Sequence, residues 1–201
     1  MASKKSKAGA RSAASIRIIG GQWRGRKLPV GDENGLRPTG DRVRETLFNW
    51  LAPFLPGARC LDAFAGTGAL GLEALSRGAV SAHFVENNPR TAAQLRSNIA
   101  HIAASEGPIS AEVIESDLMH WHASPAAFDI VFFDPPFAED LWQAALARLE
   151  NDIPLNPEAL IYIESPNDKA LTPPSHWQVR REKRFGATTA TLYETSAPLT
   201  R

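Results

Sequence analysis

From about residue 58 onward, the sequence alternates between predicted strands and predicted helices, and this alternation constrains the fold more than any other feature. Neighbouring parallel strands need long crossover connections, which helices supply, so the pattern predicts an α/β fold with a doubly wound, mostly parallel sheet. The predicted strands are 58–64, 80–86, 109–115, 128–134 and 159–165, and the predicted helices are 70–78, 89–101 and 139–150. Two more strands, 177–185 and 188–194, are joined at Gly186 and predict an antiparallel C-terminal hairpin, which makes seven strands in all.

The chain has 201 residues, the size of one ordinary domain, and we expect three parts within it. Residues 1–15 predict a disordered basic tail, residues 16–40 a basic β-hairpin extension, and residues 41–201 the main domain, which opens with a helix at 41–52. The apolar share of 43% is typical of a globular chain, and no apolar run approaches the ~18 residues of a membrane span. Cys60 is the only cysteine, which excludes an intramolecular disulfide and fits a reducing compartment such as the cytoplasm.

Positive charge is concentrated at the start of a chain whose net charge is zero. Residues 1–44 carry eleven basic and three acidic side chains, so the rest of the chain has a net charge of −8. Such a segment favours a polyanionic partner, because each neutralised phosphate releases counterions, although a solubilising tail explains residues 1–15 equally well. Within the hairpin, Trp23 offers a candidate stacking surface. The candidate nucleic-acid contacts are Arg17, Trp23, Arg24, Arg26, Lys27, Arg37, Arg42 and Arg44.

A glycine motif, Gly66-x-Gly68-x-x-Gly71, follows the first predicted strand of the main domain and opens a helix. Glu86 ends the next strand, 20 residues after the first glycine, where an acid can accept hydrogen bonds from ribose hydroxyls. This pattern is shared by sites for NAD and for S-adenosylmethionine. Asp62 favours the second, because a carboxylate four residues before Gly66 repels a pyrophosphate and attracts the ammonium and sulfonium groups of S-adenosylmethionine. Asp117, after the third strand, is a candidate acceptor for the adenine amino group or an ordinary cap of the turn that follows.

The segment Asp134-Pro135-Pro136-Phe137 ends the fourth predicted strand. The prolines make the segment stiff and extended at the carboxyl edge of the sheet, where doubly wound sheets bind ligands. The Asp134 carboxylate and the Pro135 carbonyl can accept the two N–H bonds of a nucleobase amine and aim its lone pair at a methyl donor. Phe137 offers a flat face to stack the extruded base. Guanine presents N1–H and N2–H side by side, two donors that suit a carboxylate, so Asp134 favours guanine N2 over adenine or cytosine.

Three blocks of the sequence resemble the D-type family of bacterial 16S ribosomal RNA guanine-N2 methyltransferases, which modify guanine 966 of the small ribosomal subunit. These blocks are RPTGDRVRETLFNWL, LDAFAGTGALGLEALSRGA and FDIVFFDPPF, and the resemblance extends from about Arg17 to Tyr193. It implies a Rossmann-like class I methyltransferase fold, S-adenosylmethionine as the methyl donor, and 16S rRNA or the small ribosomal subunit as the partner. It also implies that Asp134 to Phe137 hold the guanine and that the basic N-terminal residues face RNA. The implied cofactor-binding residues are Asp62, Ala63, Gly66, Thr67, Gly68, Glu86, Asn87, Asp117 and Leu118.

Three alternatives remain open on the sequence. The first is an amino-methyltransferase acting on adenine or cytosine in DNA, although no separate domain for reading a DNA sequence is visible in 201 residues. The second is a non-catalytic RNA-binding assembly factor, which is disfavoured by the intact glycine loop and Asp-Pro-Pro-Phe segment. The third is an NAD-dependent oxidoreductase. His120 and His122 are too few to hold a metal ion, so no metal site is expected.

Overall fold

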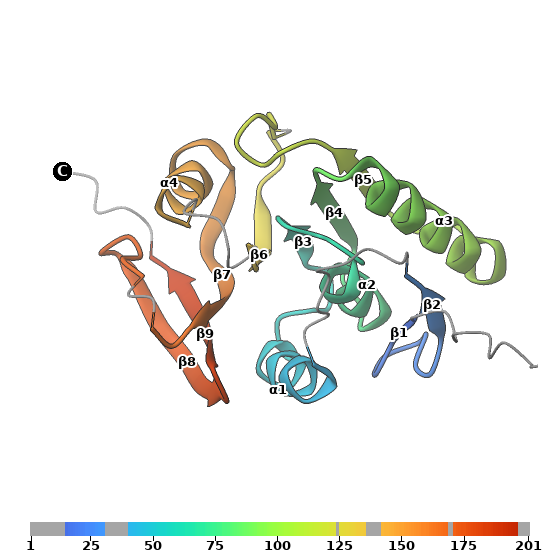
Figure 1. Ribbon diagram of the computed structural model, residues 1–201, viewed down its shortest axis with the longest axis horizontal. Helices are drawn as coiled ribbons and strands as arrows, with labels where there is room; N and C mark the ends of the chain where they lie inside the picture. The colour runs from blue at the N-terminus through green and yellow to red at the C-terminus, as the bar shows by residue number, and fades with distance from the viewer. Residues whose placement is uncertain (1–14, 31–39, 124, 136–141, 169–170, 197–201) are drawn as a thin grey trace, which may run out of the picture.

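The computed structural model describes residues 15–30, 40–123, 125–135, 142–168 and 171–196 (Figure 1). Its main sheet has seven strands in the order β5-β4-β3-β6-β7-β9-β8. The strands are β3 (Arg59–Asp62), β4 (Ser81–Glu86), β5 (Ala111–Glu115), β6 (Phe128–Phe133), β7 (Leu155–Pro166), β8 (Trp177–Phe185) and β9 (Thr188–Thr195). The first five strands of this order pair in parallel, whereas β9 is antiparallel to both β7 and β8. The predicted α/β fold, with a mostly parallel sheet and an antiparallel C-terminal hairpin, is therefore confirmed.

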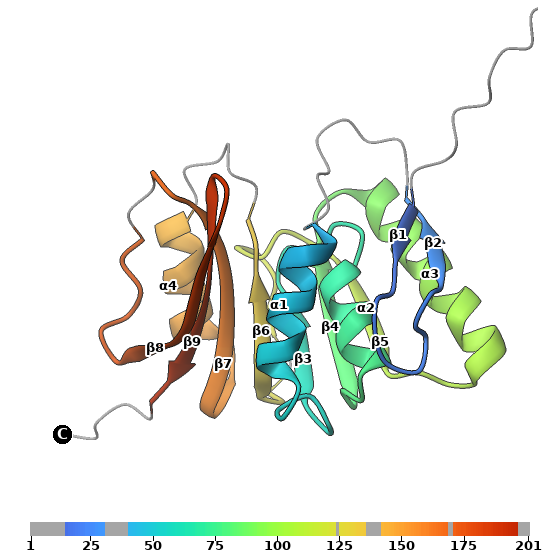
Figure 2. The ribbon, with the colours of Figure 1, turned by 90° about the horizontal axis from the view of Figure 1, so that it is seen from below.

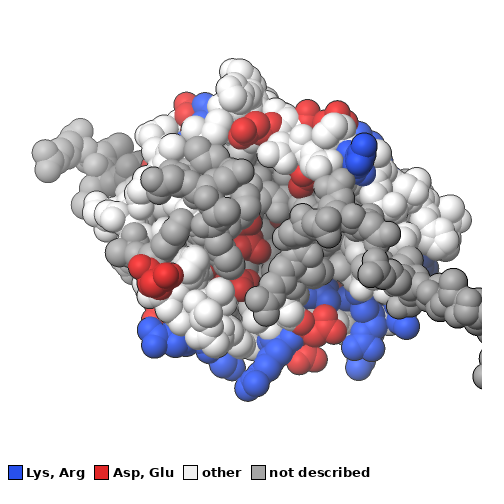
Figure 3. Space-filling view, in the orientation of Figure 1, with Lys and Arg blue, Asp and Glu red and all other residues white. Residues whose placement is uncertain are grey.

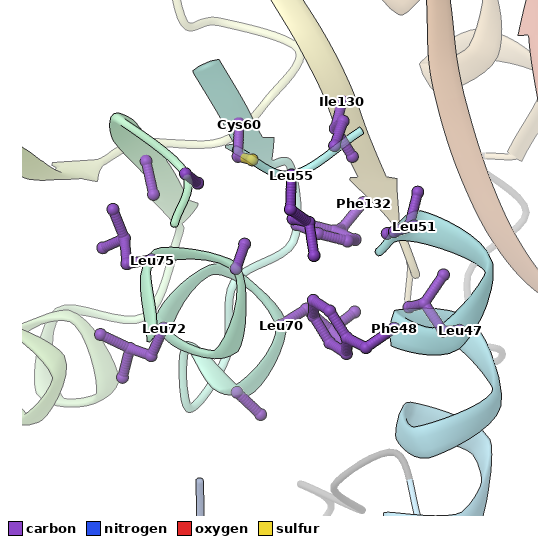
Figure 4. Packing of buried hydrophobic residues seen from close by; sticks show 14 of the residues in the cluster. Leu47, Phe48, Leu51, Leu55, Cys60, Leu70, Leu72, Leu75, Ile130 and Phe132 are labelled. Atoms are coloured by element: carbon purple, nitrogen blue, oxygen red, sulfur yellow. The ribbon is translucent and has the colours of Figure 1, made fainter. Parts of the chain in front are cut away.

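Helices cover both faces of this sheet and create two hydrophobic clusters. The helices are α1 (Asp41–Leu51), α2 (Ala69–Ser76), α3 (Pro89–Glu106) and α4 (Trp142–Asp152). In the first cluster, α1, α2 and α3 lie on one face, and Phe48 of α1 meets Phe132 of β6 with their ring centroids 5.9 Å apart (Figure 4). The second cluster packs α4 against the opposite face. Each large apolar side chain fully buried in this way stabilises the fold by about 1.5–3 kcal/mol, which fixes the strand ends that carry the polar residues described below.

The N-terminal segment is a separate two-stranded ribbon of β1 (Ser15–Arg17) and β2 (Lys27–Pro29), paired antiparallel as predicted (Figure 2). The loop between the strands is attached to the end of α2 through Ser76. The Ser76 hydroxyl donates to the Gly20 carbonyl at 2.6 Å and accepts from the Trp23 amide at 2.9 Å. The side chain of Trp23 is 1% exposed and belongs to the first hydrophobic cluster. The prediction that Trp23 offers an exposed stacking surface is therefore wrong, because anchoring the loop on α2 turns the indole into the core.

Arg44 is also buried, which contradicts the prediction that it faces RNA. Its guanidinium donates to Asp41 and to the Arg17 carbonyl, and lies 4.0 Å from the fully buried Glu73. Glu73 in turn accepts from the Ile19 amide at 2.8 Å. Arg44 and Glu73 therefore connect the ribbon, α1 and α2. The closer partner of Glu73 is Arg77, whose Nε donates to the carboxylate at 2.6 Å, so two guanidinium groups compensate the buried charge.

The other basic candidates differ in their freedom to bind an external anion. Arg26 is bound to Glu106 and to Ser105 at the end of α3. Arg17, Arg24, Lys27 and Arg42 are exposed, and the Arg17 guanidinium lies 3.6 Å from the exposed Asp41 carboxylate. Arg37 lies outside the described residues. Within the described part of the chain, no helix is long and apolar enough to cross a membrane.

The attachment of the ribbon to α2 requires a glycine at position 21. Gly21 has a φ of +73°, and a Cβ there would lie 1.8 Å from the Ser76 carbonyl oxygen. Gly25 in the same loop has a φ of +88° with nothing within 4 Å of an added Cβ. We expect Gly25→Ala to lower the free energy of unfolding by about 1–2 kcal/mol, the cost of the left-handed backbone alone. Gly21→Ala should cost about 1–3 kcal/mol more, because it adds overpacking.

Urea denaturation of both variants measures this difference. Equal losses of stability in the two variants would show that the close approach of the loop to Ser76 contributes nothing.

Candidate active site

The parallel strands β3, β4, β6 and β7 end at one edge of the sheet, and each carries an acidic residue at or next to its end. Asp62 ends β3, Glu86 ends β4, Asp134 follows β6, and Glu164 lies near the end of β7. Asp62 is paired with Phe84 of β4 on one side and with Phe132 of β6 on the other, which aligns these strand ends. The carboxyl edge of such a sheet is the usual place for a ligand site. We therefore treat this edge as the candidate active site.

The predicted glycine turn lies between β3 and α2 and makes a close passage of the backbone. Gly66 and Gly68 have φ values of +49° and +75°, which glycine adopts without strain. A Cβ on Gly68 would lie 2.4 Å from a methyl carbon of Leu95 in α3, and one on Gly71 would lie 2.3 Å from the ring of Phe84. Packing between α2, α3 and β4 therefore requires small residues in this turn, whether or not a ligand is bound. Ala63 is buried and Thr67 is half-buried beside the turn.

Asp62 is 3% exposed, and its carboxylate accepts a hydrogen bond from the Gly71 amide at 3.0 Å. Burial raises the pKa of Asp62 to about 8, against a lowering by the Gly71 hydrogen bond. The negative charges of Asp134 and Glu86 contribute to this rise, after burial. The parallel pairing of β3 with β6, in which Asp62 lies opposite Phe132, places the corner after β6 at the same edge of the sheet as the glycine turn. Such a site disfavours a further negative charge and favours a cation.

Glu86 connects the glycine turn to the start of α3. One carboxylate oxygen accepts from the Gly66 amide at 2.8 Å, and the other accepts from the Asn88 amide at 2.7 Å. Asn88 in turn caps α3 by accepting from the Arg90 and Thr91 amides. Each oxygen of Glu86 keeps a second lone pair, so these bonds orient the carboxylate and leave it able to accept from a ligand hydroxyl. Asn87, beside it, is exposed.

Asp117 lies in the turn after β5, next to Glu86 because Glu86 is paired with Glu115. Its carboxylate accepts from the Met119 amide at 2.9 Å, which is the capping role left open by the sequence. Asp117 is half-buried, whereas Leu118 is 2% exposed and packs into the second cluster. The structure thus brings Asp117 to the same edge as Asp62 and Glu86.

At the corner after β6, Asp134 is half-buried and Pro135 is buried. Pro136 and Phe137 lie outside the described residues. The strand leading to the corner is held rigidly, since Phe133 meets Phe64 edge to face with centroids 5.3 Å apart and the Phe132 carbonyl accepts from the Ala63 amide at 3.0 Å. The structure therefore unites Asp62, Glu86, Asp117 and Asp134, the acidic residues that the sequence singled out.

Sequence reasoning missed Glu164 in β7, which is 8% exposed. Its carboxylate accepts hydrogen bonds from the hydroxyls of Tyr162 and Thr188 at 3.2 and 3.0 Å. Burial raises the pKa of Tyr162, and the charges of Glu164 and Asp134 raise it further. An acid at the end of an apolar strand was visible in the sequence, but only the order of the strands shows that it is beside Asp134.

Charge is distributed unevenly over the face formed by this edge. Figure 3 shows acidic side chains near its middle and a row of lysines and arginines along its lower margin, over β8, α1 and the β1–β2 ribbon. Among the described residues, no group of three or more His, Cys, Asp or Glu side chains could hold a metal ion. This face can therefore attract a polyanion along its margin while its centre favours a cation.

The raised pKa of Asp62 predicts a specific dependence of stability on pH. The pKa of Asp62 is near 4 in the unfolded chain and about 8 in the folded protein. Between these two pH values the folded state binds a proton that the unfolded state lacks, so the free energy of unfolding falls as the pH rises. Asp62→Asn keeps an acceptor for the Gly71 amide and removes the titration. We expect the variant to gain stability relative to the parent from pH 5 to pH 8, by up to about 1.4 kcal/mol per pH unit.

Urea denaturation across this pH range provides the measurement, and Glu45→Gln, at an exposed carboxylate of α1, is the control. If the stability curves of Asp62→Asn and the parent run parallel, the buried Asp62 is charged throughout and its proposed titration is wrong.

Comparison with known proteins supports the resemblance found in the sequence. The family model described as Conserved hypothetical protein 95 matches residues 16–194. "Ribosomal RNA small subunit methyltransferase D" of Escherichia coli K12 is 50% identical, over 92% of this chain and 92% of the relative. The protein of the same name from Haemophilus influenzae is 46% identical, over 89% of this chain and 93% of the relative. A solved structure of the Escherichia coli protein yhhF matches with a TM-score of 0.82 at 49% identity and covers 92% of this chain and 99% of that one. The chain therefore belongs to the Conserved hypothetical protein 95 family and is a relative of the D-type methyltransferases of small-subunit ribosomal RNA.

Proposed function

We propose that this protein transfers a methyl group from S-adenosylmethionine to the exocyclic N2 of one guanine in 16S rRNA of the small ribosomal subunit. The names of its relatives support methylation of small-subunit rRNA. Acting on this substrate would place the protein in the cytoplasm. The observation that carries the proposal is the closeness of the Asp134 corner to the glycine turn. Asp62 is paired with Phe132 of β6, two residues before Asp134, and the Ala63 amide donates to the Phe132 carbonyl at 3.0 Å. A base held at this corner and a donor held at the turn are then neighbours.

The residues at the edge fit S-adenosylmethionine better than a dinucleotide. Asp62 is a buried carboxylate whose pKa is raised by burial and by Asp134 and Glu86, so a cation relieves its electrostatic cost and a pyrophosphate increases it. In this proposal Asp62 and the turn at Gly66 to Gly68 hold the methionine part, with Ala63 and Thr67 beside them. Glu86 and Asn87 hold the ribose, and Asp117 and Leu118 frame the adenine. When bound, the cofactor supplies an electrophilic methyl group on a sulfonium.

Asp134 and Pro135 position the accepting amine. A nucleobase amine is a poor nucleophile because its lone pair is delocalised into the ring. Hydrogen bonds from its two N–H groups to the Asp134 carboxylate and the Pro135 carbonyl hold the nitrogen pyramidal and direct the lone pair at the methyl carbon. The cationic amine that results is strongly acidic, and the Asp134 carboxylate accepts its proton. Pro136 stiffens the corner and Phe137 stacks the base; both assignments are based on the sequence alone.

The exposed basic residues along the margin of the face are proposed to bind the RNA backbone. On the N-terminal side they are Arg17, Arg24, Lys27 and Arg42, together with Arg37 on sequence grounds. Arg181, Lys183 and Arg184 of β8 are also exposed and form the other side of the margin. Trp23 and Arg44 take no direct part, because both are buried, and Arg26 is held by Glu106.

The central role of Asp134 predicts a separation of catalysis from cofactor binding. Asp134→Ala should lower methyl transfer to rRNA by at least about 10³-fold, because it removes both the orienting acceptor and the proton acceptor. Its affinity for S-adenosylmethionine should stay within a few-fold of the parent. Tritium transfer to small-subunit rRNA, followed by mass spectrometry of the nucleosides, measures methyl transfer. Calorimetry measures the affinity for S-adenosylmethionine.

Glu112→Ala, which removes an exposed carboxylate far from the corner, is the matched control and should retain full activity. Near-normal turnover by Asp134→Ala would refute the role of Asp134. A methylated adenine or cytosine in the digest would favour the alternative base, and a parent protein with no affinity for S-adenosylmethionine would favour the non-catalytic assembly factor.

The basic margin predicts a salt-dependent loss of RNA binding. Arg24→Glu and Lys27→Glu should each weaken binding to small-subunit rRNA and reduce the slope of log K against log salt by about 0.7–0.9 for each phosphate that is no longer bound. Cofactor affinity should not change. Arg90→Glu, the same charge change at an exposed residue at the start of α3, is the control. If all three variants bind RNA equally well, the ribbon does not contact the RNA.

A further inference from the structure

Glu164 lies directly beside Asp134, although the mechanism above gives it no role. Phe132 is paired with Tyr162 and Phe133 with Ile163, so one further step places Asp134 opposite Glu164. Paired residues share a face of the sheet, and Phe132 and Tyr162 both pack into the cluster below α1 and α2. Neighbouring strands are ~4.8 Å apart, so the two acids occupy adjacent positions on one face of the carboxyl edge.

The surroundings of Glu164 leave its charge poorly compensated. Its side chain is 8% exposed, and its hydrogen-bond donors are the neutral hydroxyls of Tyr162 and Thr188. Among the described residues, the ion pairs of the fold include none to Glu164. A carboxylate buried in this way costs stability unless it is paired or hydrogen-bonded. The two hydroxyls orient the group, and each oxygen keeps a lone pair for a further donor.

Guanine presents the donor that this position lacks. Its Watson–Crick edge carries three N–H bonds, two on N2 and one on N1. In the proposed function, Asp134 and Pro135 accept the two bonds on N2. This arrangement replaces the pairing of Asp134 with N1–H and N2–H that the sequence suggested, and it leaves N1–H to be satisfied. Burying N1–H without an acceptor would cost roughly 1–3 kcal/mol of binding. The carboxylate next to Asp134 along the sheet is Glu164.

We propose that Glu164 accepts the N1–H of the target guanine and is a specificity-determining residue of the site. This inference rests on the proposed function and extends it from the amine to the identity of the base. Adenine presents a bare acceptor at N1, which a carboxylate repels, and a cytosine has no equivalent second donor beside its amine. Thr188 and Tyr162 act on recognition indirectly, by holding the carboxylate in place.

The test compares three small-subunit rRNA substrates that differ only at the methylated position. They carry guanosine, 2,6-diaminopurine riboside or 1-methylguanosine. Diaminopurine keeps the 2-amino group but has a bare acceptor at N1, and 1-methylguanosine replaces the N1–H with a methyl group. The parent should use both analogues at least about tenfold less well than guanosine, as judged by kcat/KM.

Glu164→Gln supplies an amide whose oxygen accepts one of the Tyr162 and Thr188 hydroxyls, and whose NH2 group can donate to the other hydroxyl oxygen and to a bare N1. The kcat/KM for diaminopurine divided by the kcat/KM for guanosine should be at least about tenfold higher in this variant than in the parent. The affinity for S-adenosylmethionine should be unchanged. Thr188→Val removes the hydroxyl that is bonded to the Glu164 carboxylate and to the Phe185 carbonyl, and should lower activity on guanosine without favouring diaminopurine. A purely structural role of Glu164 would lower activity on both bases by the same factor.

An unchanged ratio in a folded Glu164→Gln variant would overturn the inference while leaving the proposed function intact. If that variant does not fold, the measurements on the parent protein test the inference: efficient methylation of 1-methylguanosine or diaminopurine at N2 would overturn it. A parent that methylates no guanine at all would overturn the proposed function and the inference together.

Discussion

The structure depends on the alignment of its parallel strands, which brings several carboxylates to one edge of one sheet. Asp62, Glu86 and Asp134 come from three different strands, and they are close enough to raise the pKa of Asp62 together with burial. Backbone amides compensate part of this charge: Gly71 donates to Asp62, and Gly66 and Asn88 donate to Glu86. The same amides position the glycine turn and the start of α3. The edge therefore has a defined geometry and an excess of negative charge, which is the physical reason that it suits a cationic ligand.

The N-terminal ribbon shows the opposite arrangement, in which charge is neutralised inside the fold. Arg44 and Glu73 are buried together, and Ser76 bonds to both sides of the Gly20–Trp23 loop. These contacts attach the ribbon to α2, the helix that follows the glycine turn. Because α2 also supplies the Gly71 amide to Asp62, the ribbon and the site share one rigid helix. The ribbon is thus part of the support of the site as well as a carrier of exposed basic residues.

Sequence patterns predicted the backbone of this fold well and the burial of individual polar and aromatic residues poorly. The seven strands, the glycine turn and the acids at strand ends follow from local periodicity and turn chemistry, which are read within a few residues. Whether Trp23 and Arg44 face solvent is decided by Ser76 and Glu73, which are about 30 to 50 residues away in the chain. An alternating basic and apolar segment is compatible with either orientation. Glu164 was missed for a similar reason, since its neighbour Asp134 is fixed by the strand order and not by the spacing in the sequence.

The distribution of charge explains how one face can serve an anionic polymer and a cationic donor. The carboxylates at its centre repel phosphates, whereas the exposed lysines and arginines along its margin attract them (Figure 3). A phosphate backbone is therefore favoured at the margin, and only an uncharged part of the nucleotide is tolerated at the centre. Extruding a base satisfies both conditions, because the base reaches the carboxylates while its phosphates stay outside. A base whose exposed edge carries several N–H donors gains the most from such a centre, so the excess of carboxylates that suits the cation also favours guanine.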